Sequence, residues 1–222
     1  MGHGIRVEVW GDYALFTRPE MKAERVSYDV MTPSAARGLI DAIYWHPGMH
    51  WVIDRIFVLN PIRFTNVRRN EVTDKASASN VQTMMNGGKP AMICASECIS
   101  QRASLLLKDV RYVIDAHFEL SKPEEPDADK KVYNIVLRRL RMGQCYHQPC
   151  FGCREFPAQF KLYESDADPA TAYPDEETRD LGYMLYDLDY SDPQNIEPIF
   201  FRASLTRGVL DLRSLREEEL RR

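Results

Sequence analysis

The chain has 222 residues, 44% of them hydrophobic, which is enough for one large domain or two small ones with a buried core. No run approaches the roughly 18 apolar residues of a membrane-spanning helix, and the N-terminus lacks the apolar segment typical of a signal peptide. The cysteine count is five, an odd number, which favours reduced thiols and a cytoplasmic protein without a membrane partner.

The net charge of −4 argues at first against a nucleic-acid partner. However, residues 1–111 contain 14 Lys and Arg against 11 Asp and Glu, a net charge of +3, whereas the rest of the chain carries −7. Much of the acid lies in two proline-containing runs, 124–129 and 164–180, which we expect to be exposed loops. A local basic surface matters more for polyanion binding than the total charge, so RNA is not excluded.

The first predicted element is a strand over residues 5–10, with Ile5, Val7 and Val9 on one face. The residues between and after them face the other way: Arg6, Glu8 and Trp10. Trp10 on this open face is a candidate for stacking on an RNA base, as aromatic residues do on the sheets of other RNA-binding domains. The alternative is that Trp10 belongs to a covered hydrophobic patch.

A helix is predicted over residues 33–45. Thr32 suits the N-cap, and Pro33 suits the first helical position because that position needs no N–H donor. Four apolar residues then recur three or four apart, as on a helix that packs against a core: Ala36, Leu39, Ile40 and Ile43. The segment just upstream has no clear periodicity and carries Arg18, Lys22 and Arg25, which we expect to project from an ordered loop and contact phosphates. A solvated charged loop is the alternative.

The remaining elements follow from similar patterns. Residues 51–65 are β-rich, 74–90 are expected to be a long loop, and 105–120 alternate as a strand with Asp115 and His117 on its polar face. A helix is predicted over 130–142 with Gly143 as its C-cap, followed by a strand within 155–164. Further strands are expected from Leu181 onward, with a hairpin turn at Arg207 and Gly208, and the last ten residues form at most a short charged helix.

The predicted order is strand, helix, strand, strand, helix, strand. This order indicates an α+β fold of the ferredoxin-like, RRM-like βαββαβ type, with a small C-terminal antiparallel sheet as an extension. We expect an N-terminal domain over residues 1–121, whose second helix and last strand come from 130–164, and a C-terminal region over 122–222.

This topology brings the end of the first helix and the end of the third strand to one edge of the sheet. Tyr44 ends that helix and His117 nearly ends that strand. A Tyr and a His at one edge suit RNA cleavage without a metal, in which a general base deprotonates the 2′-OH and an acid protonates the departing 5′-oxygen. The alternative is that Tyr44 packs on the sheet edge and His117 is an ordinary surface histidine.

The cysteines allow a further hypothesis. Cys150 and Cys153 form a C-x-x-C pair, and Cys94, Cys98, Cys145 and His147 are additional donors, so a zinc-binding structural protein is an open alternative. The i, i+4 spacing of Cys94 and Cys98 is loose for a metal site, and no second C-x-x-C appears, which makes this interpretation weaker.

Four segments closely resemble the CRISPR-associated proteins of family five, Dvulg (type I-C) subtype, in the RAMP superfamily. They are the stretch from Val9 to Gly38, IRFTNVRRNEV at 62–72, VRYVIDAHFEL at 110–120 and CFGCREFPAQF at 150–160. These segments are spread over most of the chain, and the first is long and specific.

The resemblance implies a metal-independent endoribonuclease without a cofactor that cuts precursor CRISPR RNA within the repeat. It implies that the protein then stays on the 5′ handle as a subunit of the type I-C surveillance (Cascade) complex in antiviral defence. Its implied partners are CRISPR RNA and the backbone and large subunits of that complex, and contact with target DNA within the complex stays open. The phosphate-contact candidates that fit RNA binding are Arg18, Lys22, Arg25, Arg37, Arg68 and Arg69.

The resemblance also implies a catalytic set with a Tyr at the end of the first helix and a Lys and a His at the end of a strand. Tyr44 and His117 match two of these, but the residue before His117 is Ala116 rather than Lys. His46, where the family often has Lys, is a substitute cation or acid. The missing Lys keeps an alternative open: a non-catalytic RNA-binding subunit that caps the 5′ handle and scaffolds the complex.

Overall fold

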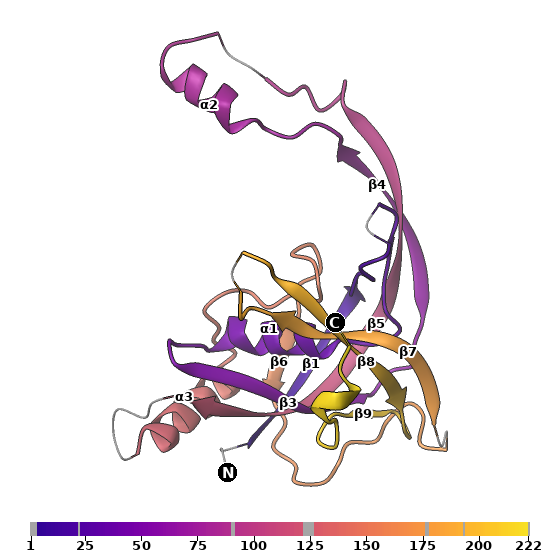
Figure 1. The fold of residues 1–222 in the computed structure, drawn as a ribbon. Helices are drawn as coiled ribbons and strands as arrows, with labels where there is room; N and C mark the ends of the chain where they lie inside the picture. Colours follow the sequence, from indigo (N-terminus) through magenta and orange to yellow (C-terminus); the bar gives the residue numbers. More distant parts are fainter. Residues whose placement is uncertain are drawn as a thin grey trace.

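The computed structural model describes residues 4–21, 23–89, 92–121, 127–175, 178–192 and 194–221. Its centre is a seven-stranded sheet in which the order β6-β1-β5-β3-β9 is antiparallel at every step (Figure 1). The five strands have these bounds: β1, Gly4–Ala14; β3, Met49–Val58; β5, Ile99–Leu120; β6, Gln159–Leu162; β9, Val209–Asp211. The strand predicted at 5–10 is confirmed and extends in both directions, and β6 occupies part of the segment predicted at 155–164.

Two helices, α1 (Pro33–Ile43) and α3 (Ala128–Met142), pack on one face of this sheet. The Thr32 hydroxyl accepts a hydrogen bond from the Ala35 backbone N–H, and Gly143 ends α3 in a left-handed conformation with φ 63°. Both predicted caps are therefore confirmed. The first helix ends at Ile43, two residues before the predicted end, because Tyr44 is already extended.

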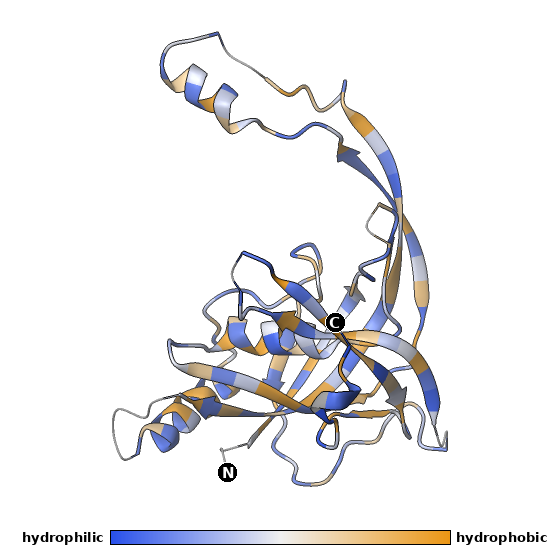
Figure 2. Ribbon diagram, in the orientation of Figure 1, coloured by the Kyte–Doolittle hydropathy of each residue, from blue (hydrophilic) through white to orange (hydrophobic). Residues whose placement is uncertain are grey.

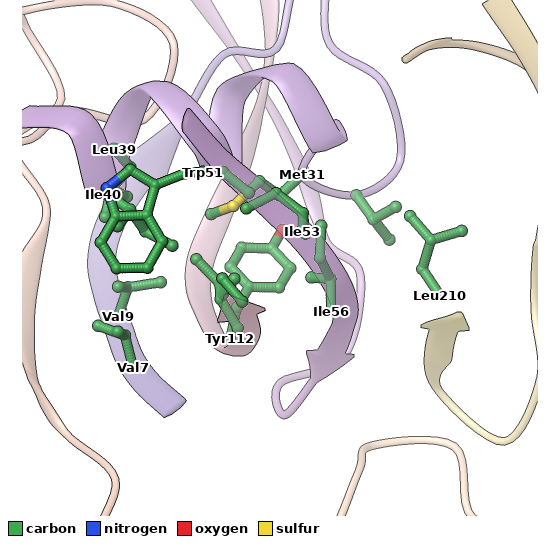
Figure 3. Close-up of a cluster of buried hydrophobic side chains, with 14 of the residues drawn as sticks. Val7, Val9, Met31, Leu39, Ile40, Trp51, Ile53, Ile56, Tyr112 and Leu210 are labelled. Carbon is green, nitrogen blue, oxygen red and sulfur yellow. The ribbon is translucent and has the colours of Figure 1, made fainter. Parts of the chain in front are cut away.

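The core lies between the sheet and the helices (Figure 3). The four residues of the predicted helical stripe are all buried, and they meet Val7 and Val9 of β1 and Trp51 and Ile53 of β3. The Trp51 indole stacks edge-on against Phe118, with ring centroids 5.5 Å apart, and donates a hydrogen bond to the Tyr44 carbonyl oxygen at 2.9 Å. This hydrogen bond fixes the chain where α1 ends.

A second, two-stranded sheet covers the outer side of α1. It consists of β7 (Arg179–Asp189) and β8 (Glu197–Leu205), paired antiparallel, and its Met184 and Phe201 join the main core. The predicted C-terminal strands are thus confirmed. The predicted turn is also present, since Arg207 and Gly208 both have positive φ, 50° and 77°, between β8 and β9. The charged C-terminus contains only a short 3-10 helix, Glu217–Glu219.

An arm extends away from this body (Figure 1). It is built from β4 (Phe64–Val72), paired antiparallel with the first half of β5, and from α2 (Ala78–Met85) beyond them. The short β2 (Arg25–Val26) lies parallel to β5 at the base of the arm. Figure 2 shows hydrophilic and hydrophobic residues mixed along the arm, in keeping with the alternation of exposed and half-buried residues in β4.

The prediction that residues 74–90 form a loop is wrong, because α2 lies within them. The Ser77 hydroxyl caps this helix by accepting a hydrogen bond from the Asn80 backbone N–H. None of the residues of α2 is buried, so the hydrophobic periodicity on which helix prediction rests is weak there.

None of the helices in the described ranges is both long and apolar enough to cross a membrane.

Glu8 departs from the simple alternation of β1. It lies on the face opposite the helices, as predicted, yet it is only 3% exposed. Its carboxylate accepts hydrogen bonds from Arg111 and is paired with Lys161 at 3.1 Å. Burial alone raises the pKa of Glu8, but the hydrogen bonds and charges of Arg111 and Lys161 outweigh burial, so its pKa lies below the ordinary value.

Because the pKa of Glu8 is lowered in the folded protein, this residue makes the stability of the protein depend on pH. A carboxylate with a lowered folded pKa stabilises the protein above its unfolded pKa, about 4.3, and the stability is lost as the pH falls through the folded pKa. We expect Glu8→Gln to have a lower free energy of unfolding than the unsubstituted protein near pH 7. Below about pH 4.3 its free energy of unfolding should fall less steeply with decreasing pH, and the two slopes should differ by less than about 1.4 kcal/mol per pH unit. Urea unfolding between pH 2.5 and 7 measures both effects. Parallel curves for the two proteins would contradict the prediction.

Candidate functional site

A β-bulge in β3 creates the candidate site. The pairing of β3 with β5 shifts between Ile53 and Arg55, so Asp54 is an additional residue in the strand. Ile53 faces the core, and after the bulge Ile56 faces the core again. Asp54 and Arg55 therefore both lie on the face opposite the helices, where a regular strand would have placed one of them toward the core.

Asp54 contacts His117 across the sheet. His117 lies on β5 between Ala116 and Phe118, which both face the core, so its own side chain is on the face opposite the helices. The His117 Nδ1 atom is 2.9 Å and 3.1 Å from the two carboxylate oxygens of Asp54. The His117 and Asp54 side chains are 29% and 26% exposed. The carboxylate therefore fixes the imidazole through Nδ1 and leaves Nε2 for another partner.

Next to this pair lies a network of two arginines and two aspartates. Asp115 accepts from Arg6 Nε at 2.7 Å and from Arg55 Nη2 at 2.6 Å, and both arginines also contact Asp168. Arg6 additionally donates to three backbone carbonyl oxygens of residues 165–167. The Arg55 hydrogen bond is the main cause that lowers the pKa of the Asp168 carboxyl. The network thus holds the 165–168 loop against the sheet and engages both guanidinium groups.

Next to this network lies a cavity of about 880 Å³, whose wall also includes residues of α3 and the core-facing Ile5 and Ala116. Asp54, Arg6, Arg55 and Asp115 form part of its wall, and β6 and α3 contribute residues on the other side. Two more arginines line it, Arg141 and Arg213, which are 56% and 55% exposed. The cavity wall thus carries four arginines and also four carboxylates: Asp54, Asp115, Glu164 and Asp166. With the oriented histidine beside it, the cavity offers its exposed arginines to a phosphodiester backbone.

Tyr44 and His46 lie together, but on the other side of the sheet. Their ring centroids are 6.0 Å apart, and the Tyr44 ring also contacts the Arg139 guanidinium at 5.1 Å and packs against the core. His46 is half-buried, and its Nδ1 atom lies 2.8 Å from the Pro47 carbonyl oxygen. The Tyr44 ring and the His117 side chain are therefore at the same end of the sheet, where Met49 pairs with Leu120, but on opposite faces.

The predicted phosphate contacts near the first loop are engaged in ion pairs. Arg18 is 2.9 Å from Asp29 and lies over the Tyr28 ring, and Arg25 is 3.4 Å from Glu71. Lys22 lies outside the described residues. The structure therefore places Arg18 and Arg25 beside the base of the arm and away from the cavity.

The other three predicted phosphate contacts, Arg37, Arg68 and Arg69, differ in exposure and in their ion-pair partners. Arg37 binds both carboxylate oxygens of Asp187, at 2.6 and 2.9 Å, and thereby ties α1 to β7. On β4, Arg69 is only 15% exposed and binds Glu155, whereas its neighbour Arg68 is exposed on the other face of the arm.

Trp10 lies beside a second, smaller cavity of about 350 Å³ on the outer face of β1. The Lys161 ammonium group lies 5.6 Å from the centre of its ring, and Asn60 and Arg111 share the cavity wall. Trp10 is half-buried rather than fully covered.

All five cysteines are unpaired thiols. Across the described ranges, no three His, Cys, Asp or Glu side chains are arranged to hold a metal ion. Burial is the main cause that raises the pKa of the Cys150 thiol. Cys150 and Cys153 lie in a turn before β6, where Gly152 has φ 82° and packs against the Leu15 backbone.

Several contributors to the site escaped the sequence analysis, and Asp54 and Arg213 are the two that matter most for the chemistry. A signal for Asp54 was present, since two consecutive charged residues interrupt the apolar run of β3 and such an interruption is typical of a bulge. No comparable signal marks Arg213, which reaches the site only because β9 pairs with β3 far along the chain.

The fold and the site define a mixed α/β protein that presents an arginine-lined cavity on an antiparallel sheet. The model of the CRISPR-associated protein family Cas_Cas5d matches residues 4–213. The CRISPR pre-crRNA endoribonuclease Cas5d of Mannheimia succiniciproducens is 48% identical over 227 residues, covering 100% of both chains. The protein of the same name from Thermus thermophilus is 38% identical over 236 residues, covering 98% of this chain and 95% of its own.

A functionally uncharacterized protein from Streptococcus mutans, SMU1763c, shares the fold, with a TM-score of 0.66 and 23% sequence identity over 95% of this chain and 92% of its own. The match with the family model and the two full-length relatives identify the chain. It belongs to the Cas5d family of CRISPR-associated proteins, as the sequence resemblance indicated.

Proposed function

We propose that this protein is a metal-independent endoribonuclease that cleaves precursor CRISPR RNA within the repeat. It then stays on the 5′ handle as a subunit of the type I-C surveillance complex, in contact with the backbone and large subunits. The observation that carries this proposal is the 48% identity, over the whole chain, with a protein named CRISPR pre-crRNA endoribonuclease. The oriented His117 beside the arginine-lined cavity supports the same chemistry.

In the proposed reaction, His117 acts as the general base. Its Nε2 atom takes the proton of the RNA 2′-OH, the 2′-oxygen forms a bond to the adjacent phosphorus, and the bond from phosphorus to the 5′-oxygen breaks. The products are a 2′,3′-cyclic phosphate and a 5′-OH, whose proton comes from an acid on the leaving-group side. Tyr44 and His46 are the proposed groups on that side. They lie at the same end of the sheet as His117 but on its other face, so the proposal requires the RNA to cross this end of the sheet.

The fold and the phosphate contacts belong to the same proposal. The strand order β6-β1-β5-β3, antiparallel throughout and with both helices on one face, supports a ferredoxin-like βαββαβ unit, with β7 and β8 as its C-terminal extension. The N-terminal domain then has its second helix and last strand in α3 and β6. Trp10 stacks on a base, and the RNA-backbone contacts come from Arg18, Lys22, Arg25, Arg37, Arg68 and Arg69.

Cleavage of the repeat RNA by the pure protein in excess EDTA tests the proposal. The matched substrate carries a single 2′-deoxy nucleotide at the cut site and so lacks the nucleophile. We expect the first RNA to be cut and the second to stay intact, with a cyclic phosphate on the 5′ product. Tight binding of both RNAs without cleavage would overturn the proposed nuclease activity. It would favour the alternative, a non-catalytic subunit that caps the 5′ handle.

Asp54 has the role of a positioning residue for His117. We expect Asp54→Asn to lower the single-turnover cleavage rate about tenfold to a hundredfold with little change in RNA affinity, because the imidazole loses the charge that orients it. Asp54→Glu keeps the carboxylate and restores part of the rate. A variant that bound RNA more weakly but cleaved bound RNA at the full rate would assign Asp54 to binding instead.

A further inference from the structure

The proposed reaction requires a positive charge near the attacked phosphorus. The phosphate gains negative charge as the 2′-oxygen attacks, and a cation beside it stabilises the transition state. Position 116, directly before His117, does not provide one, because Ala116 is 1% exposed and faces the core. The cation must therefore come from another element that reaches the Asp54–His117 pair.

Two of the four arginines that line the cavity, Arg6 and Arg55, are held in an enclosed network of ion pairs. Arg6 and Arg55 share Asp115 and Asp168, their side chains are only 16% and 17% exposed, and Arg6 holds the 165–167 backbone as well. Moving either guanidinium onto a phosphate would break a network of several charge-assisted hydrogen bonds. Arg141 is as exposed as Arg213, and its pair with Glu164 is exposed too, but it lies on α3, which is not hydrogen-bonded to the strand that carries Asp54.

Arg213 is held next to Asp54 by the backbone. In β9, Asp211 pairs with Arg55, and the Leu212 N–H donates to the Asp54 carbonyl oxygen at 2.9 Å. Arg213 is the next residue, and its side chain lines the same cavity as Asp54. The bulge that turns Asp54 toward His117 thus also anchors the segment that carries this arginine.

The electrostatics of Arg213 agree with this placement. The Asp211 hydrogen bond is the largest cause that raises the pKa of Arg213; burial opposes it, and the charges of Asp54 and Asp115 add to the increase. The partner of Arg213 is Asp211, at 2.5 Å, in a pair that is 55% and 40% exposed. The pair is bidentate, since Nε also donates to the other Asp211 oxygen at 3.0 Å, but it is far more exposed than the side chains of Arg6 and Arg55. A phosphate can therefore reach the Arg213 guanidinium without breaking an enclosed network.

We propose that Arg213 is the catalytic cation of this site, which contacts the scissile phosphate beside the Asp54–His117 pair and stabilises the charge that it gains. The inference rests on the proposed endoribonuclease function. It adds a residue from the C-terminal segment to a site otherwise formed by β3 and β5.

Single-turnover cleavage of the repeat RNA in EDTA tests the inference, together with affinity for the uncleavable 2′-deoxy RNA. Arg216 provides the matched control, since it lies three residues further on, is 76% exposed and forms an ion pair with the exposed Glu218. We expect Arg213→Ala to lower the cleavage rate about 10²- to 10³-fold while its RNA affinity stays close to that of Arg216→Ala. Arg213→Lys keeps the charge without the planar fork and is expected to recover about tenfold.

The outcomes separate the two proposals. Equal cleavage rates for Arg213→Ala and Arg216→Ala, in a protein that cuts the RNA, would overturn the role of Arg213 and leave the nuclease in place. A loss that appears only in RNA affinity would also overturn it, because it would make Arg213 a general phosphate contact. No cleavage by the unsubstituted protein would overturn the proposed function and, with it, this inference.

Discussion

Replacement of His117 by Ala is expected to lower the single-turnover cleavage rate of repeat RNA by about 10²- to 10⁴-fold. The reason is that the variant loses the imidazole that the Asp54 carboxylate holds beside the cavity, with Nδ1 at 2.9 Å. The fold should survive, because the side chain is 29% exposed and lies on the face opposite the core. Cleavage in EDTA at saturating protein, with circular dichroism as a check of folding, measures the effect.

His50 supplies the matched control for this experiment. It is an exposed histidine on β3, opposite Glu119 and close in the sheet to the Val52–His117 pair. We expect His50→Ala to cleave at nearly the normal rate, because His50 lines neither of the two cavities described above. If His117→Ala cleaved as fast as His50→Ala, the catalytic base would have to be sought elsewhere, with Tyr44 and His46 as the next positions to test.

Replacement of Trp51 by Ala should have the largest effect on stability, about 3–5 kcal/mol. Trp51 is 1% exposed, stacks on Phe118 and donates to the Tyr44 carbonyl oxygen, so the change removes a large apolar contact and leaves an acceptor without its partner. Trp51→Phe keeps most of the packing and should cost less, because it loses mainly the hydrogen bond. Urea unfolding followed by circular dichroism gives both free energies of unfolding.

The control for Trp51 is another tryptophan of the same region. Trp45 is 53% exposed, so Trp45→Ala is expected to change the free energy of unfolding by no more than about 0.5 kcal/mol. A cost for Trp45→Ala similar to that for Trp51→Ala would mean that the packing at the end of α1 differs from the structure described above. Because Trp51 holds the Tyr44 backbone, Trp51→Phe should also reduce cleavage if Tyr44 takes part in the reaction.

Some parts of the fold could be predicted because their signals are local. The N-cap at Thr32, the C-cap at Gly143 and the turn at Arg207 each depend on neighbouring residues only. The buried stripes of α1 and β5 could be predicted from the spacing of their apolar residues, and these residues form part of the core. The helix α2 was missed because it buries nothing and so leaves no stripe to detect.

The candidate site was only partly predictable, for a different reason. Alternation correctly placed His117 on the polar face of its strand, and topology placed Tyr44 at the same end of the sheet. Sequence spacing, however, does not say on which side of the sheet a residue beyond a helix end will lie. The Tyr44 ring packs on the helix side, so the two residues are near one edge but on opposite faces.

Local sequence patterns were therefore enough to define most of the elements, their caps and the buried faces, because these depend on contacts between residues a few positions apart. The contacts between charged residues that are distant in the chain, in contrast, depend on the tertiary structure. A single additional residue in β3 turns Asp54 toward His117. A short strand near the C-terminus brings Arg213 beside Asp54, although 158 residues separate the two in the chain. Both contacts depend on strand register, which is set by the packing of the whole sheet rather than by any local pattern.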